Sequence, residues 1–183
     1  MVSVADAELK PGQIRFGIKS AYPFSRFWAN YEPDDVIPVW YPWYYVTLGV
    51  KMDTYLKKGM SYRDLVAVDS LRPVRERLAS KPELSETELM DGVTPESKIS
   101  ADEAESEAVD LMKGIVLSRN KLLKDYDIET LSVELVRHKT FIVQLKGRQP
   151  AEWLYLDSHF DAATRLGMRP EILKHVVSSY EHT

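Results

Sequence analysis

Residues 36–51, VIPVWYPWYYVTLGVK, decide the fold that the rest of the chain must complete. Valine, tryptophan, tyrosine, isoleucine and threonine dominate this stretch, and these side chains suit the pleated, packed surface of a β-strand. Alternation places Trp43 on one face and Tyr44 on the other, which predicts a strand that is covered on both faces. Pro38 and Pro42 cannot donate ladder hydrogen bonds, so we expect this end to lie at a sheet edge or before the strand proper.

Two hairpins can be traced outward from this strand. In the first, Lys-Lys-Gly at 57–59 forms a turn that leads to a second strand at 65–68. In the second, strands at 130–146 and 153–157 flank a Gly-Arg-Gln-Pro turn. A His-Lys pair at 138–139 predicts a turn or bulge that divides the longer strand. Both hairpins indicate antiparallel pairing.

The clearest helix begins after Ser100. Ser100 and Glu103 form an S-x-x-E capping box, in which the hydroxyl accepts from the Glu103 amide and the carboxylate accepts from the Ser100 amide. A second helix closes the chain, with Pro170 at its first turn. The first helix carries one apolar stripe of period 3.6, which comprises Ala104, Ala108, Leu111, Met112, Ile115 and Val116.

These elements predict an α+β fold. We expect an antiparallel sheet of four to six strands, one long amphipathic helix packed on a face, and a C-terminal helix over an edge or end. The length of 183 residues fits a single domain, 1–183, which could also consist of two similar halves. The halves would be 1–80 (an aromatic arm and hairpin) and 99–183 (a helix, a hairpin and the C-terminal helix). An acidic linker at 81–99 would join them, at the start of a run, 83–110, that contains ten acids and one base.

The case for two halves rests on a repeated pattern. A hydrophobic hairpin ends in Asp69-Ser70 in the first half and in Asp157-Ser158 in the second. Identity between the two segments is low, so the sequence leaves open whether they arose by duplication.

The second half contains a helix that opens with ISADEA at 99–104, strands at 128–135 and 140–146, and the strand WLYLD at 153–157. This pattern, over about 99–166, resembles the PepSY family of small α+β modules. The chain departs from the family after the last aspartate, where Ser-His-Phe-Asp stands in place of the usual Thr-Gly turn. The resemblance implies a binding or inhibitory module without catalytic residues, and it would extend to the first half if the repeat is a duplication.

Composition excludes several classes of protein. The chain has no cysteine, which excludes disulfides, thiolate catalysis and cysteine-ligated metal sites. A net charge of −4 argues against general nucleic-acid binding, which needs clustered lysine and arginine. The most apolar run is shorter than the roughly 20 residues that a membrane span requires. No signal peptide is recognisable, so we expect a cytoplasmic protein with no membrane span.

The sequence offers no positive sign of catalysis. Its histidines are scattered, and it has neither a glycine-rich phosphate loop nor an H-E-x-x-H motif. Asp157, His159 and Asp161 form D-x-H-x-D, which could hold a metal if all three lay on one strand. Because the strand is expected to end at Asp157, a turn is the favoured interpretation. We therefore expect no catalytic residues, no metal and no cofactor, and leave an enzyme of unrecognised type open.

A cluster of aromatic rings is the remaining feature. Tryptophan and tyrosine are enriched at binding hot spots because they bury a large area and keep a polar group. The rings could equally form the core beneath the N-terminal arm. The candidate partner- or ligand-binding residues are Trp28, Trp40, Trp43, Tyr44 and Tyr45.

The leading functional hypothesis is a non-catalytic binding or interaction module, an accessory or regulatory subunit of a larger assembly. The alternative is a small protein that binds an apolar ligand in an aromatic-lined cleft. Under the first hypothesis we expect a protein partner or a homodimer, formed through strand 43–50 as an open sheet edge.

Overall fold

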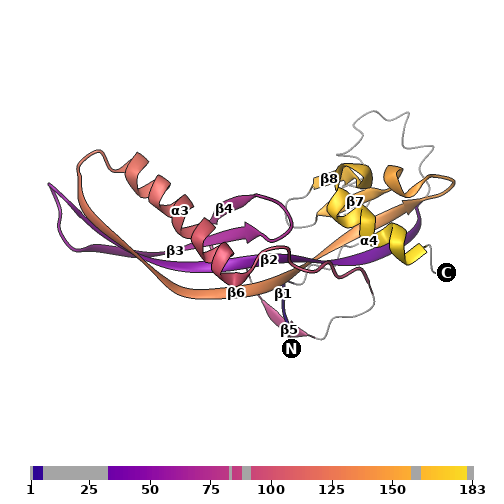
Figure 1. The fold of residues 1–183 in the computed structure, drawn as a ribbon, viewed down its shortest axis with the longest axis horizontal. Helices are drawn as coiled ribbons and strands as arrows, with labels where there is room; N and C mark the ends of the chain where they lie inside the picture. Colours follow the sequence, from indigo (N-terminus) through magenta and orange to yellow (C-terminus); the bar gives the residue numbers. More distant parts are fainter. Residues whose placement is uncertain (1, 6–32, 83, 88–91, 158–161, 181–183) are drawn as a thin grey trace. The chain divides into compact units, whose positions relative to one another are not determined.

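The computed structural model describes residues 2–5, 33–82, 84–87, 92–157 and 162–180. Within these ranges the chain has the predicted α+β class, with α-helices and an antiparallel sheet (Figure 1). Six strands follow in the order β4-β3-β2-β6-β1-β5, and β7 and β8 join the sheet through β6. The elements are β1 (Val2–Ala5), β2 (Pro33–Thr54), β3 (Met60–Asp69), β4 (Arg75–Leu78), β5 (Ser85–Thr87), α3 (Ala101–Arg119), β6 (Leu123–Leu145), η1 (Pro150–Glu152), β7 (Leu154–Asp157), β8 (Ala162–Arg165), η2 (Leu166–Met168) and α4 (Pro170–Tyr180).

The chain divides into two compact units, each built from separate segments of the sequence. Unit 1 comprises Met1–Tyr41, Leu84–Glu96 and Arg137–Thr183, and unit 2 comprises Pro42–Glu83 and Ser97–Val136. The long strands β2 and β6 each contribute one part to either unit. The division therefore differs from the predicted halves 1–80 and 99–183, which assumed that each unit is continuous in sequence.

β2 is an interior strand of the sheet. It pairs with β3 from Trp43 to Met52, and β6 is its neighbour on the other edge. From Val39 to Val46 both of its faces are buried, since Trp43 is 4 % exposed and Tyr44, on the opposite face, is 8 % exposed. Beyond Val46 one face stays buried, and Lys51 on the other is exposed. The expectation that strand 43–50 offers an open edge is therefore wrong. Pro42 suggested an edge, but β6, which follows much later in the chain, is the second neighbour of β2 in the sheet.

Part of the predicted linker at 81–99 is bound to β2. The Trp40 amide donates to the Val93 carbonyl, and the Val93 amide donates to the Pro38 carbonyl, both at 2.9 Å. Gly92 has a φ of +150°, and a Cβ there would lie 2.5 Å from the Pro38 carbonyl oxygen. Glycine is needed at this position because the two backbones approach so closely.

β6 runs unbroken through the predicted turn or bulge at 138–139. His138 lies inside the strand and is 5 % exposed. The antiparallel register of Phe141 with Leu156 confirms the second predicted hairpin, just as the β2–β3 pairing confirms the first. We predicted a break because of the two polar residues at 138–139, but the fold accommodates both of them within the strand.

A three-strand meander occurs twice in the fold. β2, β3 and β4 pair in succession, and so do β6, β7 and β8. An α-helix follows each meander later in the chain, α3 after the first and α4 after the second. In each meander the second strand ends at the aspartate of the repeated sequence pattern, β3 at Asp69 and β7 at Asp157.

α3 begins at the predicted cap. The Glu103 amide donates to Ser100 Oγ at 3.2 Å, and the Ser100 amide donates to the Glu103 carboxylate at 2.7 Å. These hydrogen bonds lower the pKa of the Glu103 carboxyl below its ordinary value. The capping box satisfies two amides that the first turn of a helix leaves without partners.

α3 lies along β3 and β4 in unit 2 (Figure 1). Four small or flexible side chains of its predicted stripe are fully buried in one core cluster with β2 and β3, while Leu111 and Ile115 are only partly buried. Leu117, elsewhere on the helix, is 56 % exposed. The helix spans 19 residues, and the marked contrast between faces that the sequence suggested is not confirmed. The fully buried residues are Ala104, Ala108, Met112 and Val116.

A nearly buried arginine precedes α4 in unit 1. The Arg169 guanidinium lies 5.2 Å from the Tyr41 ring and 4.5 Å from the Tyr155 ring. Its Nε is 2.9 Å from a Glu171 carboxylate oxygen, and the two side chains are 11 % and 5 % exposed. Burial raises the pKa of the Tyr155 hydroxyl, so this ring stays neutral. The arginine is thus compensated by two aromatic faces and one carboxylate.

Replacing the cap should weaken the fold. Ser100→Ala removes the acceptor of the Glu103 amide and should lower the free energy of unfolding by about 0.5–2 kcal/mol, measured by urea denaturation. Ser106→Ala, in the exposed interior of α3, is the control and should be neutral or slightly stabilising, because alanine favours helices. Equal losses in the two variants would contradict a role for the cap.

Removing the buried cation should cost more. Arg169→Met takes the positive charge away from buried Glu171 and should lower the free energy of unfolding by about 3–5 kcal/mol. The double variant Arg169→Met/Glu171→Gln should recover part of that loss, because no buried charge then needs compensation. Additive losses in the double variant would contradict a coupled pair.

Candidate functional site

The predicted aromatic residues lie in the interior. Trp40, Trp43, Tyr44 and Tyr45 are 2 %, 4 %, 8 % and 1 % exposed, and Trp28 lies outside the described residues. Burial, with a smaller contribution from the Glu76 carboxylate, raises the pKa of the Tyr45 hydroxyl. This placement corresponds to the core alternative and leaves little ring surface for a partner.

The predicted D-x-H-x-D motif is described only at Asp157, because His159 and Asp161 lie outside the described residues. Among the residues that the structure does describe, no group of three or more histidines and carboxylates could hold a metal ion. In the same part of the chain, no helix is both long enough and apolar enough to cross a membrane.

The corner after β3 uses its polar groups within the fold. Asp69 is 1 % exposed, and its carboxylate accepts from the Leu71 amide at 2.9 Å and from Arg72 Nε at 2.8 Å. Ser70 Oγ donates to the Pro42 carbonyl at 2.9 Å. The first Asp-Ser pair of the repeat therefore fixes a turn beside a pocket of about 290 Å³.

The sheet of unit 2 has an edge that is only partly covered. β4 pairs with β3 over four positions, from Leu65 to Val68. β2, on the other side, pairs with β3 as far as Met60. Within the described part of the chain, the segment from Met60 to Asp64 therefore has a ladder partner on one side only. Such an edge presents amides and carbonyls that can pair with another strand.

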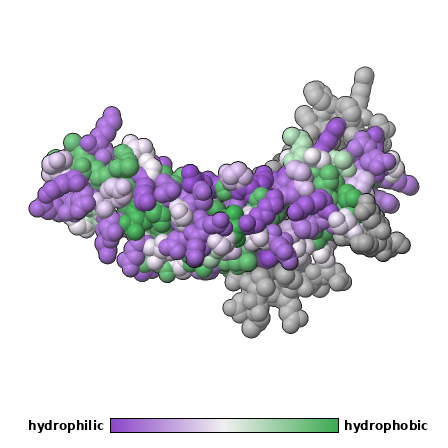
Figure 2. Space-filling model, in the orientation of Figure 1, coloured by the Kyte–Doolittle hydropathy of each residue, from purple (hydrophilic) through white to green (hydrophobic). Residues whose placement is uncertain are grey.

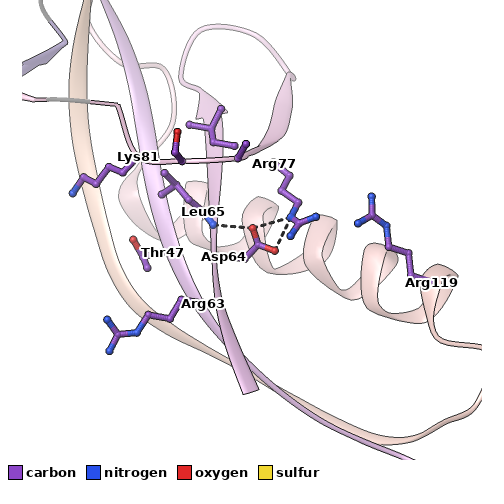
Figure 3. Close-up of a pocket in the computed structure, with 10 residues that line it drawn as sticks. Thr47, Arg63, Asp64, Leu65, Arg77, Lys81 and Arg119 are labelled. Atoms are coloured by element: carbon purple, nitrogen blue, oxygen red, sulfur yellow. Dashed lines mark hydrogen bonds and ion pairs between the residues drawn. The ribbon is translucent and has the colours of Figure 1, made fainter. Parts of the chain in front are cut away.

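A pocket of about 730 Å³ lies where β4 ends, and we call it the edge notch. Figure 3 shows Asp64, Arg77 and Arg119 on the side of β3 that faces α3, and Arg63 and Lys81 on its other side. The notch therefore surrounds the end of the sheet edge. Its lining comprises Thr47, Arg63, Asp64, Leu65, Arg77, Leu78, Ala79, Ser80, Lys81 and Arg119.

Two of the residues that line the edge notch, Asp64 and Arg77, form an ion pair. Arg77 Nε lies 2.8 Å and 2.6 Å from the two carboxylate oxygens of Asp64 (Figure 3). Arg77 stands opposite Val66 in the ladder, so Asp64 is its diagonal neighbour on the same face. The Asp64 side chain is 4 % exposed, and its hydrogen bonds and charge raise the pKa of Arg77. Asp64 also accepts from the Leu65 amide at 3.0 Å.

Two other cations of the edge notch remain available to a ligand. Arg63 and Arg119 form no ion pair with any residue that the structure describes, and both are exposed. Lys81 is 2.8 Å from a Glu134 carboxylate, which compensates its charge. With Arg77 paired to Asp64, the notch keeps an excess of positive charge in a chain of net charge −4. A positively lined recess of this kind attracts anionic groups.

Sequence reasoning missed this site because Arg63, Arg77 and Arg119 are far apart in the chain. The alternation Arg75-Glu76-Arg77 could have indicated a short, charged edge strand. Nothing in the sequence indicates that the end of α3 lies beside that strand, so the cluster could be found only from the fold.

Comparison with family models, with curated proteins and with solved structures found nothing that matches this chain.

The Arg77–Asp64 pair should be needed for stability. Arg77→Ala leaves the buried Asp64 carboxylate without its strongest donor and should lower the free energy of unfolding by about 1–3 kcal/mol in urea denaturation. Arg63→Ala, at an exposed neighbouring arginine, should change it by less than about 0.5 kcal/mol. A similar loss in both variants would mean that general edge charge, rather than this pair, supports the sheet.

Proposed function

We propose that the protein is a non-catalytic binding module whose edge notch receives an extended, acidic segment of a partner protein. The segment adds a strand to the open part of β3, and its carboxylates meet Arg63 and Arg119. The observation that carries this proposal is the half-covered β3 edge, flanked by two arginines without ion pairs in the described chain.

The dimensions of the edge suit this mode of binding. The five residues from Met60 to Asp64 span roughly 17 Å as a strand. Main-chain hydrogen bonds along such an edge supply affinity, and alternate side chains supply specificity. Arg63 lies within the open segment and Arg119 beside it, so the carboxylates of an added strand lie within their reach.

Charge favours an acidic partner over a second copy of this chain at this edge. Two copies joined through the Met60–Asp64 edges would bring Arg63 of each close to the other's edge notch, and like charges repel there. An acidic strand would instead neutralise both arginines. The predicted homodimer therefore gains no support from this edge, and the prediction of a protein partner is retained as part of the proposal.

The alternative of an apolar-ligand cleft is less well supported. Trp40, Trp43, Tyr44 and Tyr45 line neither the edge notch nor the pocket at the Asp69 corner. The resemblance to PepSY modules stays a prediction, and the binding or inhibitory role that it implies agrees in kind with the proposal.

A fluorescein-labelled peptide that repeats Glu-Glu-Val-Val is a direct probe of the edge notch, because as a strand it carries glutamates on both faces, toward Arg63 and toward Arg119. It should bind the full-length protein in fluorescence anisotropy, and Arg63→Glu/Arg119→Glu should weaken the affinity at least about ten-fold. Lys174→Glu, which reverses an exposed charge on α4, should leave the affinity unchanged.

A second peptide separates strand addition from charge attraction. Replacing every Val-Val pair by Pro-Pro keeps the charge and removes amides from both edges of the peptide, which disrupts ladder pairing whichever edge faces β3. The glutamate–proline peptide should bind far more weakly. Equal binding of the two peptides, or no effect of the arginine reversals, would overturn the proposal.

A further inference from the structure

The β2–β3 hairpin tip presents apolar side chains to solvent. Tyr55 is 76 % exposed and Leu56 is 83 % exposed. The loop between α3 and β6 lies beside them, because the Tyr55 amide donates to the Leu122 carbonyl at 3.0 Å, and Leu122 is 48 % exposed. The neighbouring Leu123 instead packs against the core cluster of unit 2. Two adjacent loops thus present three large apolar side chains outward, which we call the tip.

The backbone of the tip is held by its own hydrogen bonds. The Thr54 amide and hydroxyl both donate to the Lys57 carbonyl, at 2.8 Å and 3.1 Å, and the Lys57 amide donates to Thr54 Oγ1 at 2.9 Å. The Gly59 amide donates to Asp53 Oδ1 at 2.8 Å, and Gly59 has a φ of +67° that suits glycine. The turn therefore holds Tyr55 and Leu56 outward without burying other parts of the chain.

Four lysines lie in the same two loops as the apolar side chains of the tip. Residues 54–59 and 120–124 contain four lysines and no carboxylate. The nearest carboxylates accept from backbone amides, Asp53 from Gly59 and Asp125 from Tyr126 at 2.9 Å, and with Asp127 they line a neighbouring pocket. Figure 2 shows hydrophobic residues in green beside hydrophilic ones at the end of unit 2 where the hairpin lies. The exposed lysines are Lys57, Lys58, Lys121 and Lys124.

We propose that the tip docks on a membrane surface that contains anionic lipids. Tyr55, Leu56 and Leu122 enter the boundary between headgroups and acyl chains, while the four lysines bind lipid phosphates and carboxylates. Exposed apolar side chains ringed by cations are the feature expected of a surface that lies on a bilayer without spanning it. This surface is separate from the open β3 edge and does not rest on the proposed function.

The arrangement of lysines and apolar side chains favours an anionic bilayer as the partner of the tip. Lysine side chains can extend their ammonium groups to the headgroups while their methylene stems stay with the apolar side chains. A neutral apolar partner would offer no counter-charge to the four lysines, and a purely acidic one would leave three apolar side chains in water. An anionic bilayer satisfies both requirements at one boundary.

Vesicle co-sedimentation of the full-length protein tests the charge requirement. The protein should bind vesicles of phosphatidylcholine mixed with phosphatidylserine, and binding should fall with added salt. Lys57→Gln/Lys58→Gln should weaken it about 25-fold, at about five-fold for each lysine near an anionic surface. The control Lys113→Gln/Lys174→Gln removes two exposed lysines elsewhere and should change it far less.

Insertion of the tip into the bilayer can be measured separately from binding. Because the chain has no cysteine, a single introduced cysteine can be labelled at a chosen position. Leu56→Cys, labelled with the polarity-sensitive dye NBD, should gain fluorescence on the anionic vesicles, whereas labelled Leu117→Cys on α3 should not. Tyr55→Ser/Leu56→Ser should lose vesicle binding at an unchanged thermal unfolding midpoint. Absence of binding, equal binding to pure phosphatidylcholine, or full binding by this double variant would falsify the proposal. So would a fluorescence gain on a soluble acidic polypeptide that equals the gain on vesicles.

Discussion

The burial of the apolar side chains of β2 is the constraint on which the rest of unit 2 depends. A strand with large side chains on both faces exposes apolar surface to water unless something covers each face. On one face, Tyr44, Val46 and Leu48 belong to the core cluster that includes the buried stripe of α3. The strand also needs a ladder partner at each edge, which β3 and β6 provide. The helix and the two neighbouring strands are thus consequences of one apolar stretch.

The candidate binding edge arises from strands of unequal length. β3 has ten residues and β4 has four, so β4 cannot cover all of β3. Charged side chains at such an edge discourage uncontrolled pairing between copies. The same charges would favour the acidic strand of the proposed function, so under that proposal protection against self-association and selection of a partner have one physical origin.

Charged groups serve different purposes in the two units. In unit 1, Arg169 is enclosed by two tyrosine rings and Glu171, which compensates its loss of hydration. In unit 2, Arg63 and Arg119 stay hydrated and have no such compensation within the described chain. Hydrated cations can exchange water for a ligand's carboxylate at a modest desolvation cost, which supports the proposal that the edge notch binds an acidic segment.

Local features of the sequence determined much of the secondary structure. The Ser100 capping box, the two hairpins and the α+β class follow from patterns within a few residues, since hydrogen bonds and side-chain alternation act over that range. Tertiary structure alone decided that β2 is interior, that β6 continues through His138, and that Arg63, Arg77 and Arg119 surround one edge. Such features depend on which distant segments pair, and pairing is set by the burial of the whole chain.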